Sequence, residues 1–425
     1  MRQTNEEKIN RLEELKETYD RFKEKPFQLN LKRGVPGKDQ LALSEPMLNI
    51  LTPEDLYQET EADFRNYGVL TGIPEAKQFF SEVLEITADE VIVGGNSSLQ
   101  LMYTVLASKM FLGQSDKNSA WAKEKVVKFL CPSPGYDRHF NATEKLGFEL
   151  IPIEMTSTGP DMDQVEILVA NDASIKGIWC IPTYSNPTGV TYSNEVVDRL
   201  AKMKTLAQDF VIMWDNAYVV HHLKEKKEHV QNVLETSKSY GTEKRVWMFC
   251  STSKITFPGA GVAALGACKE NIDWVTEVLS DQTIGFDKVN QKRHVKFLKD
   301  KKHLLQHMEK HTELLKPKFD SISNLFGNYF GEESTMLEWT EPNGGYFVHL
   351  TTMDGCADRI VELLADIGVS LTEANASYPY GVNPRNNSIR LAPTSISVEE
   401  IEAAVKAICL CVEMVSLEKE LDSNK

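Results

Sequence analysis

The sequence lacks the features that would place the chain in a membrane or carry it across one. No apolar run approaches the roughly 18 residues that a membrane span needs. The N-terminus, Met-Arg-Gln-Thr-Asn-Glu-Glu-Lys, contains no apolar stretch of the kind found in secretory signal peptides. We therefore expect a cytoplasmic protein.

Cysteine and histidine are also scarce. The chain has 7 cysteines and 9 histidines, and no two cysteines are spaced as C-x-x-C. Several cysteines lie inside apolar runs, which predicts reduced side chains packed in the core. The pair His221 and His222 follows an expected strand, where a solvated or capping role is commoner than metal binding. We predict no metal site.

Positive charge is in deficit, with 47 Lys and Arg against 62 Asp and Glu and a net charge of -15. Such a chain repels nucleic acid and anionic lipid, so neither is expected as a partner. Hydrophobic residues make up 41% and charged residues 26%, which is ordinary for a folded protein and excludes a disordered one. A chain of 425 residues exceeds the size of one hydrophobic core, so we expect a large and a small domain.

Between about residues 90 and 265, short β-branched runs alternate with helix-length amphipathic stretches. This alternation is typical of a mostly parallel sheet covered by helices. We expect an α/β large domain over residues 51–290, with Thr52-Pro53-Glu54-Asp55 starting a helix near its beginning. Its seven-stranded sheet is predicted to contain Glu90–Val93, Val126–Leu130, Phe148–Ile153, Ile175–Ile181, Phe210–Trp214, Val246–Cys250 and Val262–Ala267.

The rest of the chain predicts a smaller α+β domain. After Gly285, a lysine-rich amphipathic stretch predicts one long helix to about Leu315, and residues 291–318 are assigned to a helix between the domains. Residues 319–425 mix strand and helix patterns, and the N-terminal segment 1–50 is expected to join them. Ser397 and Glu400 form a capping box that starts the last helix.

Chemistry in an open α/β sheet is sought just beyond the carboxyl ends of the strands. The segment Gly94-Gly-Asn96-Ser97-Ser98 joins a strand to a helix, and its backbone N–H groups and hydroxyls suit a phosphate. Taken alone, an ordinary helix N-cap explains the segment better. Tyr136 follows another strand through a Pro-Gly turn, where it either stacks on a flat cofactor or covers a loop.

Three further strand ends carry polar groups. Asn186 stands before a proline, where it is either part of a turn or a placed hydrogen-bond donor. Asp215, three residues before Tyr218, follows an apolar run, so its carboxylate needs a cation or donor as a partner. Lys254 follows Ser251 and Ser253 after another apolar run, and a desolvated lysine there becomes a nucleophilic amine. Each motif is weak alone, but their coincidence at strand ends of one sheet predicts a single cofactor site.

These motifs resemble the class I aminotransferases of the fold-type I pyridoxal-phosphate superfamily over about residues 31–417. Asn186-Pro-x-Gly189, Asp215-x-x-Tyr218, Ser251-x-Ser253-Lys254 and Arg390 occur in the family's order. The flanking sequence, including Tyr67-Gly-Val-Leu-Thr-Gly72 and Asn343-Gly-Gly-Tyr346, is most similar to that of the subgroup Ic aspartate aminotransferases. This subgroup is related to the aminotransferase domain of MocR-type regulators.

The resemblance implies pyridoxal 5'-phosphate as the cofactor and assigns a role to each motif. Lys254 would hold the cofactor as a Schiff base and then act as the catalytic base, while Asp215 would bind the pyridine nitrogen. Asn186 and Tyr218 would bind the phenolic oxygen, and Tyr136 would stack on the ring. Hydroxyl and amide groups of Asn96, Ser97, Ser98, Ser251 and Ser253 would hold the phosphate.

The resemblance also implies a homodimer with shared sites and a substrate pocket. Tyr67 would reach the phosphate of the partner subunit's cofactor, and Arg390 would bind the substrate α-carboxylate beside Asn186 and the pair Arg33-Gly34. One position departs from the family, because the arginine that many members carry eight residues after the lysine is Val262 here. Lys288, Arg293 or another cation would then neutralise the phosphate.

The implied reaction is ping-pong transfer of an amino group from an L-amino acid, aspartate in this subgroup, to a keto acid such as 2-oxoglutarate. A lyase or another amino acid aminotransferase on the same scaffold would use the same cofactor residues. An effector-binding module and a catalytically silent relative are further alternatives. The first is disfavoured by the acidic charge and the short N-terminal segment, and the second by the presence of Lys254 and Asp215.

Overall fold

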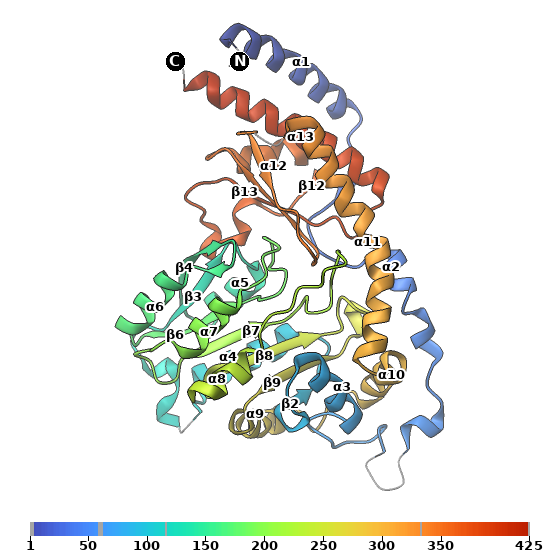
Figure 1. The fold of residues 1–425 in the computed structure, drawn as a ribbon, viewed down its shortest axis with the longest axis vertical. Coiled ribbons are helices and arrows are strands. Elements are labelled where there is room, and N and C mark those ends of the chain that lie inside the picture. Colours follow the sequence, from blue (N-terminus) through green and yellow to red (C-terminus); the bar gives the residue numbers. More distant parts are fainter. Residues whose placement is uncertain (1–3, 58–62, 115–116, 332–333, 424–425) are drawn as a thin grey trace.

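The centre of the protein is a mostly parallel sheet of eight strands in the order β2-β9-β8-β7-β6-β3-β4-β5 (Figure 1). The computed structural model describes residues 4–57, 63–114, 117–331 and 334–423. All seven expected strands are present, and a two-residue strand, β5, adds an antiparallel edge beside β4. The strands are β2 Val91–Val93, β3 Lys128–Ser133, β4 Glu149–Thr156, β5 Gly159–Pro160, β6 Ile175–Cys180, β7 Val211–Asp215, β8 Val246–Ser251 and β9 Ala263–Ala267.

The inner strands of this sheet are buried on both faces, which explains their continuous apolar sequences, whereas β4 near one edge is partly exposed. In β7, Val211 and Met213 join one hydrophobic cluster, whereas Ile212 and Trp214 join another. Neighbouring side chains point to opposite faces, so the sheet needs a helical layer on each side. The layers consist of α3 Pro74–Leu84, α6 Met162–Asn171, α7 Asn194–Lys202 and α8 Val233–Tyr240 on one face, and α4 Ser98–Phe111, α5 Asp137–Lys145 and α9 Lys269–Gln282 on the other.

A second, smaller α+β part lies at the other end of the molecule (Figure 1). Its antiparallel sheet has the order β10-β11-β13. The helix that starts at the Ser397 capping box packs along the first helix of the chain, so both ends of the described chain lie in this part. Its elements are α1 Asn5–Glu24, β1 Leu29–Asn30, α2 Lys38–Ala42, β10 Leu337–Trp339, β11 Val348–Thr352, α12 Ala357–Asp366, β12 Val369–Ser370, β13 Ser388–Leu391 and α13 Val398–Asp422.

The prediction of a single helix after Gly285 is wrong, because two helices occupy this stretch. Helix α10, Lys288–Leu298, ends before Lys299, whose φ of 61° is incompatible with a continuing helix. Asp300 then caps α11, Lys301–Phe330, by accepting a hydrogen bond from the His303 backbone N–H at 2.8 Å. Helix α11 runs from the large sheet to the small part (Figure 1).

The helix start expected at Thr52 is also only partly present. The Thr52 backbone N–H donates to Asp55 at 2.7 Å, as in a capping box, but the segment that follows is a 3₁₀ turn, Pro53–Leu56.

All seven cysteines are reduced and buried, as expected. Within the described ranges, no helix is both long and apolar enough to cross a membrane. The same ranges contain no group of three or more His, Cys, Asp or Glu side chains placed to bind a metal ion.

Helix α4 carries an unusual buried charge, the ammonium group of Lys109. Its Nζ lies 5.7 Å from the ring centre of Trp121 and 5.3 Å from those of Trp247 and Trp274, and it donates a hydrogen bond to Gln114. Burial lowers the pKa of Lys109 from 10.5 to about 8. The cation is therefore stabilised by aromatic faces rather than by a contacting carboxylate.

The lowered pKa of Lys109 predicts a pH-dependent stability. Above pH 8 the folded protein releases this proton while the unfolded chain keeps it up to about pH 10.5, so folding becomes more favourable as the pH rises through this window. Relative to Lys109→Met, the free energy of unfolding of the unmodified chain should rise by about 1–3 kcal/mol between pH 8 and pH 10. Urea unfolding at both pH values measures the difference. Parallel profiles for the two proteins would contradict the assignment.

Candidate active site

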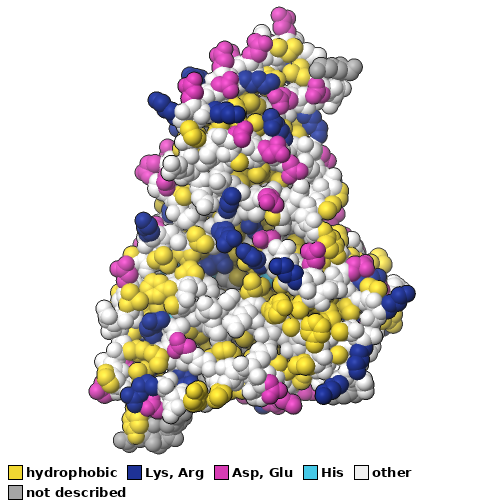
Figure 2. All heavy atoms as spheres, turned by 180° about the vertical axis from the view of Figure 1, so that it is seen from behind, with side chains coloured by type: hydrophobic (Ala, Val, Ile, Leu, Met, Phe, Trp, Pro, Cys, Tyr) yellow, Lys and Arg dark blue, Asp and Glu magenta, His cyan; other side chains and the backbone are white. Residues whose placement is uncertain are grey.

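A cavity of about 760 Å³ lies at the carboxyl ends of the central strands and extends beneath the small part of the molecule. Its walls include most of the polar residues predicted from the sequence. Seen from behind the view of Figure 1, Lys and Arg side chains gather around a hollow near the middle of the molecule (Figure 2). The predicted residues that line the cavity are Arg33, Gly34, Ser97, Ser98, Tyr136, Asn186, Asp215, Tyr218, Ser251, Ser253, Lys254 and Arg390.

Lys254 lies in the turn that follows β8, with its side chain in the cavity. Its Nζ is 5.0 Å from the ring centre of Tyr218 and 6.0 Å from that of Tyr346. Burial lowers the pKa of the Lys254 amine, and the negative charge of Asp215 partly opposes this effect. The fold thus increases the neutral, nucleophilic fraction of this amine.

Asp215 is the last residue of β7, the strand beside β8, and is only 3% exposed. Its Oδ2 lies 3.0 Å from Nε2 of His139, a residue of α5. Its Oδ1 is buried and has no hydrogen-bond partner in the part of the chain that the structure describes. A buried carboxylate oxygen without a partner is costly, so Oδ1 is suited to accept a hydrogen bond from a ligand.

His139 is held in place by its neighbours. Its ring stacks on Trp179 with 4.0 Å between centres and 9° between planes, and Tyr136 meets it edge-on.

Burial and the charges of Asp137 and Asp215 raise the pKa of Tyr136 to about 12. Burial also raises the pKa of Tyr218 well above its ordinary value. Both tyrosines therefore keep their hydroxyl protons at neutral pH and can donate hydrogen bonds.

Arg390 enters the cavity from β13 of the small part. Its guanidinium donates to Asp137 at 3.1 Å, to Asn186 Oδ1 at 3.3 Å and to Thr372 at 3.1 Å. The group lies 5.1 Å from the ring centre of Phe347, and its buried Nε has no hydrogen-bond partner among the described residues. These contacts fix the orientation of a planar guanidinium, a group that pairs well with carboxylates.

Four of the five residues predicted to hold a phosphate, Ser97, Ser98, Ser251 and Ser253, line the cavity. Ser97 is the N-cap residue of α4, and Ser98 is the first residue of this helix. The Ser97 side chain makes no capping hydrogen bond to the described helix. The hydroxyl of Ser251 donates to Ser253 at 3.0 Å, and Ser253 contacts the backbone carbonyl of Asn96 at 3.4 Å. The Asn96 side chain is exposed and does not line the cavity.

Tyr67 lies outside the cavity of its own chain. It is 75% exposed and borders a separate surface pocket with Asn66, Phe286 and Lys288. By contrast, Gly34 lies directly on the cavity wall, where an added Cβ would come within 2.7 Å of Phe347 Cζ. A side chain at residue 34 would displace the ring on which Arg390 rests.

Neither Lys288 nor Arg293, the cations proposed to replace the arginine missing at Val262, lies in the cavity. Val262 is buried, and its backbone N–H donates to Thr252. Lys288 donates to the carbonyl of Gly68, and Arg293 donates to Asn290, so neither candidate cation lines the cavity. The cations that do line it in the described chain are Lys32, Arg33, Arg138, Lys254 and Arg390.

Sequence reasoning missed several residues of this site. Asp137, Thr372 and Phe347 support Arg390 but belong to distant segments without a motif. His139 was detectable, because it lies three residues after Tyr136 and so on the same side of α5. The expectation of a solvated or capping His221 is wrong, because His221 is buried where the segment carrying Gly345 pairs with it.

A two-part α/β fold with this cavity is that of the fold-type I aminotransferases, a fold family that uses pyridoxal phosphate. A family model described as aspartate amino-transferase matches residues 3–424. An aspartate aminotransferase of Corynebacterium glutamicum is 39% identical over 406 residues, which cover 96% of this chain and 94% of that protein. The chain therefore belongs to the aspartate aminotransferase family.

Solved structures agree with this placement. The crystal structure of an aspartate transaminase from Corynebacterium glutamicum matches with a TM-score of 0.94 at 38% identity and covers 97% of both chains. An α-aminoadipate aminotransferase from Thermus thermophilus, solved with N-(5'-phosphopyridoxyl)-L-leucine, shares the fold with a TM-score of 0.72 at 20% identity over 93% of both chains. These matches show that the chain is an aminotransferase, and they argue against the lyase and effector-module alternatives.

The environment of Lys254 predicts how its amine titrates. Since the charge of Asp215 raises the pKa that burial lowers, Asp215→Asn should lower the pKa of Lys254 further. The pH dependence of Lys254 acetylation by acetic anhydride, followed by mass spectrometry on the full-length chain without cofactor, measures the pKa. Asp273→Asn is the control, because Asp273 is exposed and pairs with Lys269. An upward or absent shift in Asp215→Asn would refute the assigned electrostatics.

Proposed function

We propose that this protein is a pyridoxal-phosphate-dependent aminotransferase that transfers the amino group of L-aspartate to 2-oxoglutarate by a ping-pong mechanism. The observation that carries the proposal is the unpartnered Oδ1 of Asp215, which is buried in the same cavity as the Lys254 amine. A heterocycle with a protonated nitrogen would satisfy this oxygen, and an aldehyde would react with the neutral amine.

The residues of the cavity fit pyridoxal phosphate. Asp215 would accept the pyridine N–H, while Tyr218 and Asn186 would bind the phenolic oxygen and Tyr136 would cover the ring. Ser97, Ser98, Ser251 and Ser253 would donate hydroxyl and backbone hydrogen bonds to the phosphate, with the positive end of the α4 dipole in support. When bound, this cofactor supplies an electron sink for the charge left when a bond to the substrate Cα breaks.

Lys254 is the proposed proton carrier. Its lowered pKa raises the fraction of neutral amine at physiological pH, and a base with a pKa near the working pH is the most effective. Its Nζ lies 5.0 Å from the ring centre of Tyr218, and no carboxylate of the described residues forms an ion pair with it. Lys254 Nζ would therefore be free to take a proton from the substrate Cα and to return it during the second half of the reaction.

Arg390 would bind the α-carboxylate of the substrate and so fix the direction of the Cα–H bond. An aspartate substrate has a second carboxylate, which needs a second cation. The cationic side chains of Lys32, Arg33 and Arg138 line the same cavity, together with the carboxylates of Asp137, Glu144 and Glu373. One of the three cations would bind the second carboxylate of a dicarboxylic substrate. The name of the Corynebacterium glutamicum relative supports aspartate in particular.

We further propose a cytoplasmic homodimer with shared sites. Tyr67 is 75% exposed and shares a surface pocket with Gly285, which follows the exposed Ile284, and this exposed apolar surface supports a contact with a partner chain. In this arrangement Tyr67 of each chain would complete the phosphate site of its partner.

The proposal predicts a spectroscopic cycle. Added pyridoxal phosphate should give a visible absorption band that depends on Lys254, and Lys254→Ala should abolish it. L-Aspartate should bleach the band and 2-oxoglutarate should restore it, as expected for two half-reactions. If the band forms but aspartate leaves it unchanged, the substrate is wrong; if no Lys254-dependent band forms, the proposed cofactor is wrong.

Arg390→Lys tests the substrate contact. Lysine keeps the charge but loses the planar pair of donors, so kcat/KM for aspartate should fall by roughly 10- to 100-fold. The cofactor band should remain. Arg385→Lys is the matched control, because Arg385 is an exposed arginine of the same segment that does not line the cavity. Equal kinetics for the two variants would exclude Arg390 as the carboxylate site.

A further inference from the structure

The backbone carbonyl of Lys254 is the meeting point of a buried hydrogen-bond network that the proposed reaction does not use. The hydroxyl of Tyr346 donates to this carbonyl at 3.2 Å, and His221 Nε2 lies 3.2 Å from it. A carbonyl oxygen only accepts, so Nε2 is the protonated nitrogen of His221. Burial and the charge of Lys254 lower the pKa of His221 to about 3, so this histidine stays neutral.

The direction of the hydrogen bonds through Tyr346 is fixed by Gln40 of α2. The backbone N–H of Gly37 donates to Gln40 Oε1 at 3.0 Å, which orients the amide. Gln40 Nε2 then donates to the Tyr346 hydroxyl at 3.0 Å and also contacts His311 Nδ1 at 3.0 Å. The Tyr346 hydroxyl accepts from Gln40 and therefore directs its own proton to the Lys254 carbonyl.

The next two residues, Ile255 and Thr256, are contacted by histidines of α10 and α11. His307 Nε2 lies 2.9 Å from the carbonyl of Ile255 and 3.2 Å from His311 Nε2. His294 Nε2 lies 2.9 Å from the hydroxyl of Thr256. Three consecutive residues, starting with Lys254, are thus tied to elements outside the central sheet.

The two side chains on the Lys254 carbonyl are also tied to each other. The backbone N–H of Gly345 donates to the carbonyl of His221 at 2.8 Å, which joins the segment of Tyr346 to the loop after β7. An added Cβ on Gly344 would come within 2.3 Å of the same His221 carbonyl, so only glycine permits this approach. His221 and Tyr346 therefore reach Lys254 as one unit.

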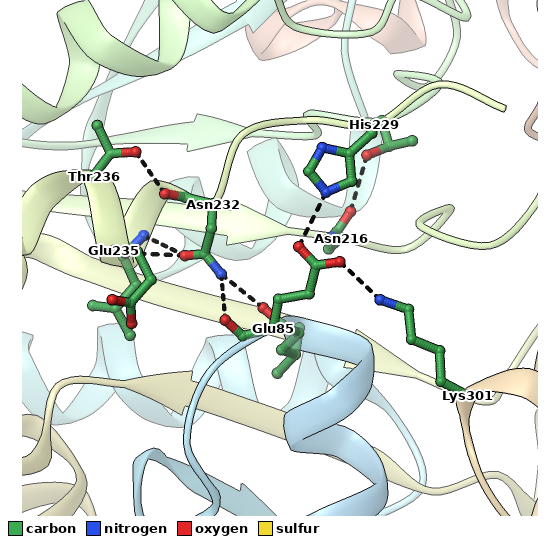
Figure 3. Close-up of polar contacts among 10 residues, drawn as sticks. Glu85, Asn216, His229, Asn232, Glu235, Thr236 and Lys301 are labelled. Carbon is green, nitrogen blue, oxygen red and sulfur yellow. Dashed lines mark hydrogen bonds and ion pairs between the residues drawn. The ribbon is translucent and has the colours of Figure 1, made fainter.

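The far end of the loop after β7 is anchored as well (Figure 3). Glu85 bonds His229 at 3.0 Å and Lys301 at 2.7 Å, and the Asn232 amide donates to the carbonyls of Leu84 and Glu85 at 2.9 Å. Both ends of the segment that carries His221 are therefore fixed, one by β7 and the other by this polar cluster.

We propose that Tyr346, Gln40 and His221 are positioning residues that fix the backbone of Lys254 and thereby hold its amine in the cavity. Tyr346 and His221 contact the carbonyl, Gln40 acts through Tyr346, and none of the three contacts the reacting atoms, so their loss should leave substrate binding intact. The network joins α2 and the small part of the molecule to the proposed base. This inference rests on the proposed function for its kinetic consequence but not for its structural one.

The test compares two deletions of a buried tyrosine hydroxyl. Tyr346→Phe removes the bond to Lys254 and keeps the ring. Tyr184→Phe is the matched control, because Tyr184 lies in the same hydrophobic cluster and its hydroxyl bonds His222 at 2.7 Å instead. Acetylation of Lys254 by acetic anhydride across a pH series, on the full-length chain without cofactor, reports the pKa of the amine independently of catalysis.

In Tyr346→Phe the released lysine should move toward water, so its pKa should rise, whereas Tyr184→Phe should match the unmodified chain. Gln40→Met, which does not contact Lys254, should shift the pKa in the same direction. In the cofactor-loaded enzyme, Tyr346→Phe should lower kcat about tenfold with KM changed less than about twofold. Thermal unfolding should show similar losses for Tyr346→Phe and Tyr184→Phe, since each variant lacks a hydroxyl that takes part in two hydrogen bonds.

Equal Lys254 titration in Tyr346→Phe, Tyr184→Phe and the unmodified chain would overturn the inference. That result leaves the proposed function intact if the Lys254-dependent absorption band forms. If the unmodified chain forms no such band, the proposed function fails, while the acetylation series still decides whether Tyr346 positions the amine.

Discussion

The site depends on the burial of a carboxylate at a strand end. Asp215 lies at the end of β7, between apolar layers, with one oxygen on His139 and the other without a partner. Such a group is costly to bury, and the cost is offset only when a donor approaches the second oxygen. The neighbouring strand β8 delivers Lys254 to the same edge, where burial favours the neutral amine. One edge of the sheet thus combines an acceptor that needs a proton donor with an amine ready to react.

The small part of the molecule completes this edge in two ways. Arg390 reaches into the cavity from β13, with Asp137, Asn186 and Thr372 fixing the plane of its guanidinium. The segment around Gly345 pairs with the backbone of His221 and brings Tyr346 to the carbonyl of Lys254. The proposed substrate contact and the proposed support of the lysine therefore both come from the small part, which links the packing of the two parts to the geometry of the site.

Much of this architecture is predictable because parallel strands buried on both faces have continuous apolar sequences. The seven strands and the motif residues at their ends follow from that pattern, including Asn186, Asp215 and Lys254. The break at Lys299 was not predictable from periodicity, because a single left-handed residue followed by the Asp300 cap leaves the amphipathic pattern of both flanking helices intact. At Thr52 the sequence predicted a helix where the structure has only a 3₁₀ turn. Capping residues stabilise such a turn whether or not a full helix follows.

The sequence by itself determined the fold class, the family and most of the polar residues that line the cavity, because local patterns and short motifs carry that information. Only the tertiary structure decided what those residues touch. His139 meets Asp215 across 76 residues, and Tyr346 meets Lys254 across 92. His221, which the sequence indicated as solvated or capping, became a buried donor once the small part covered it. Contacts of this kind arise where two bodies pack together, and no linear spacing records them.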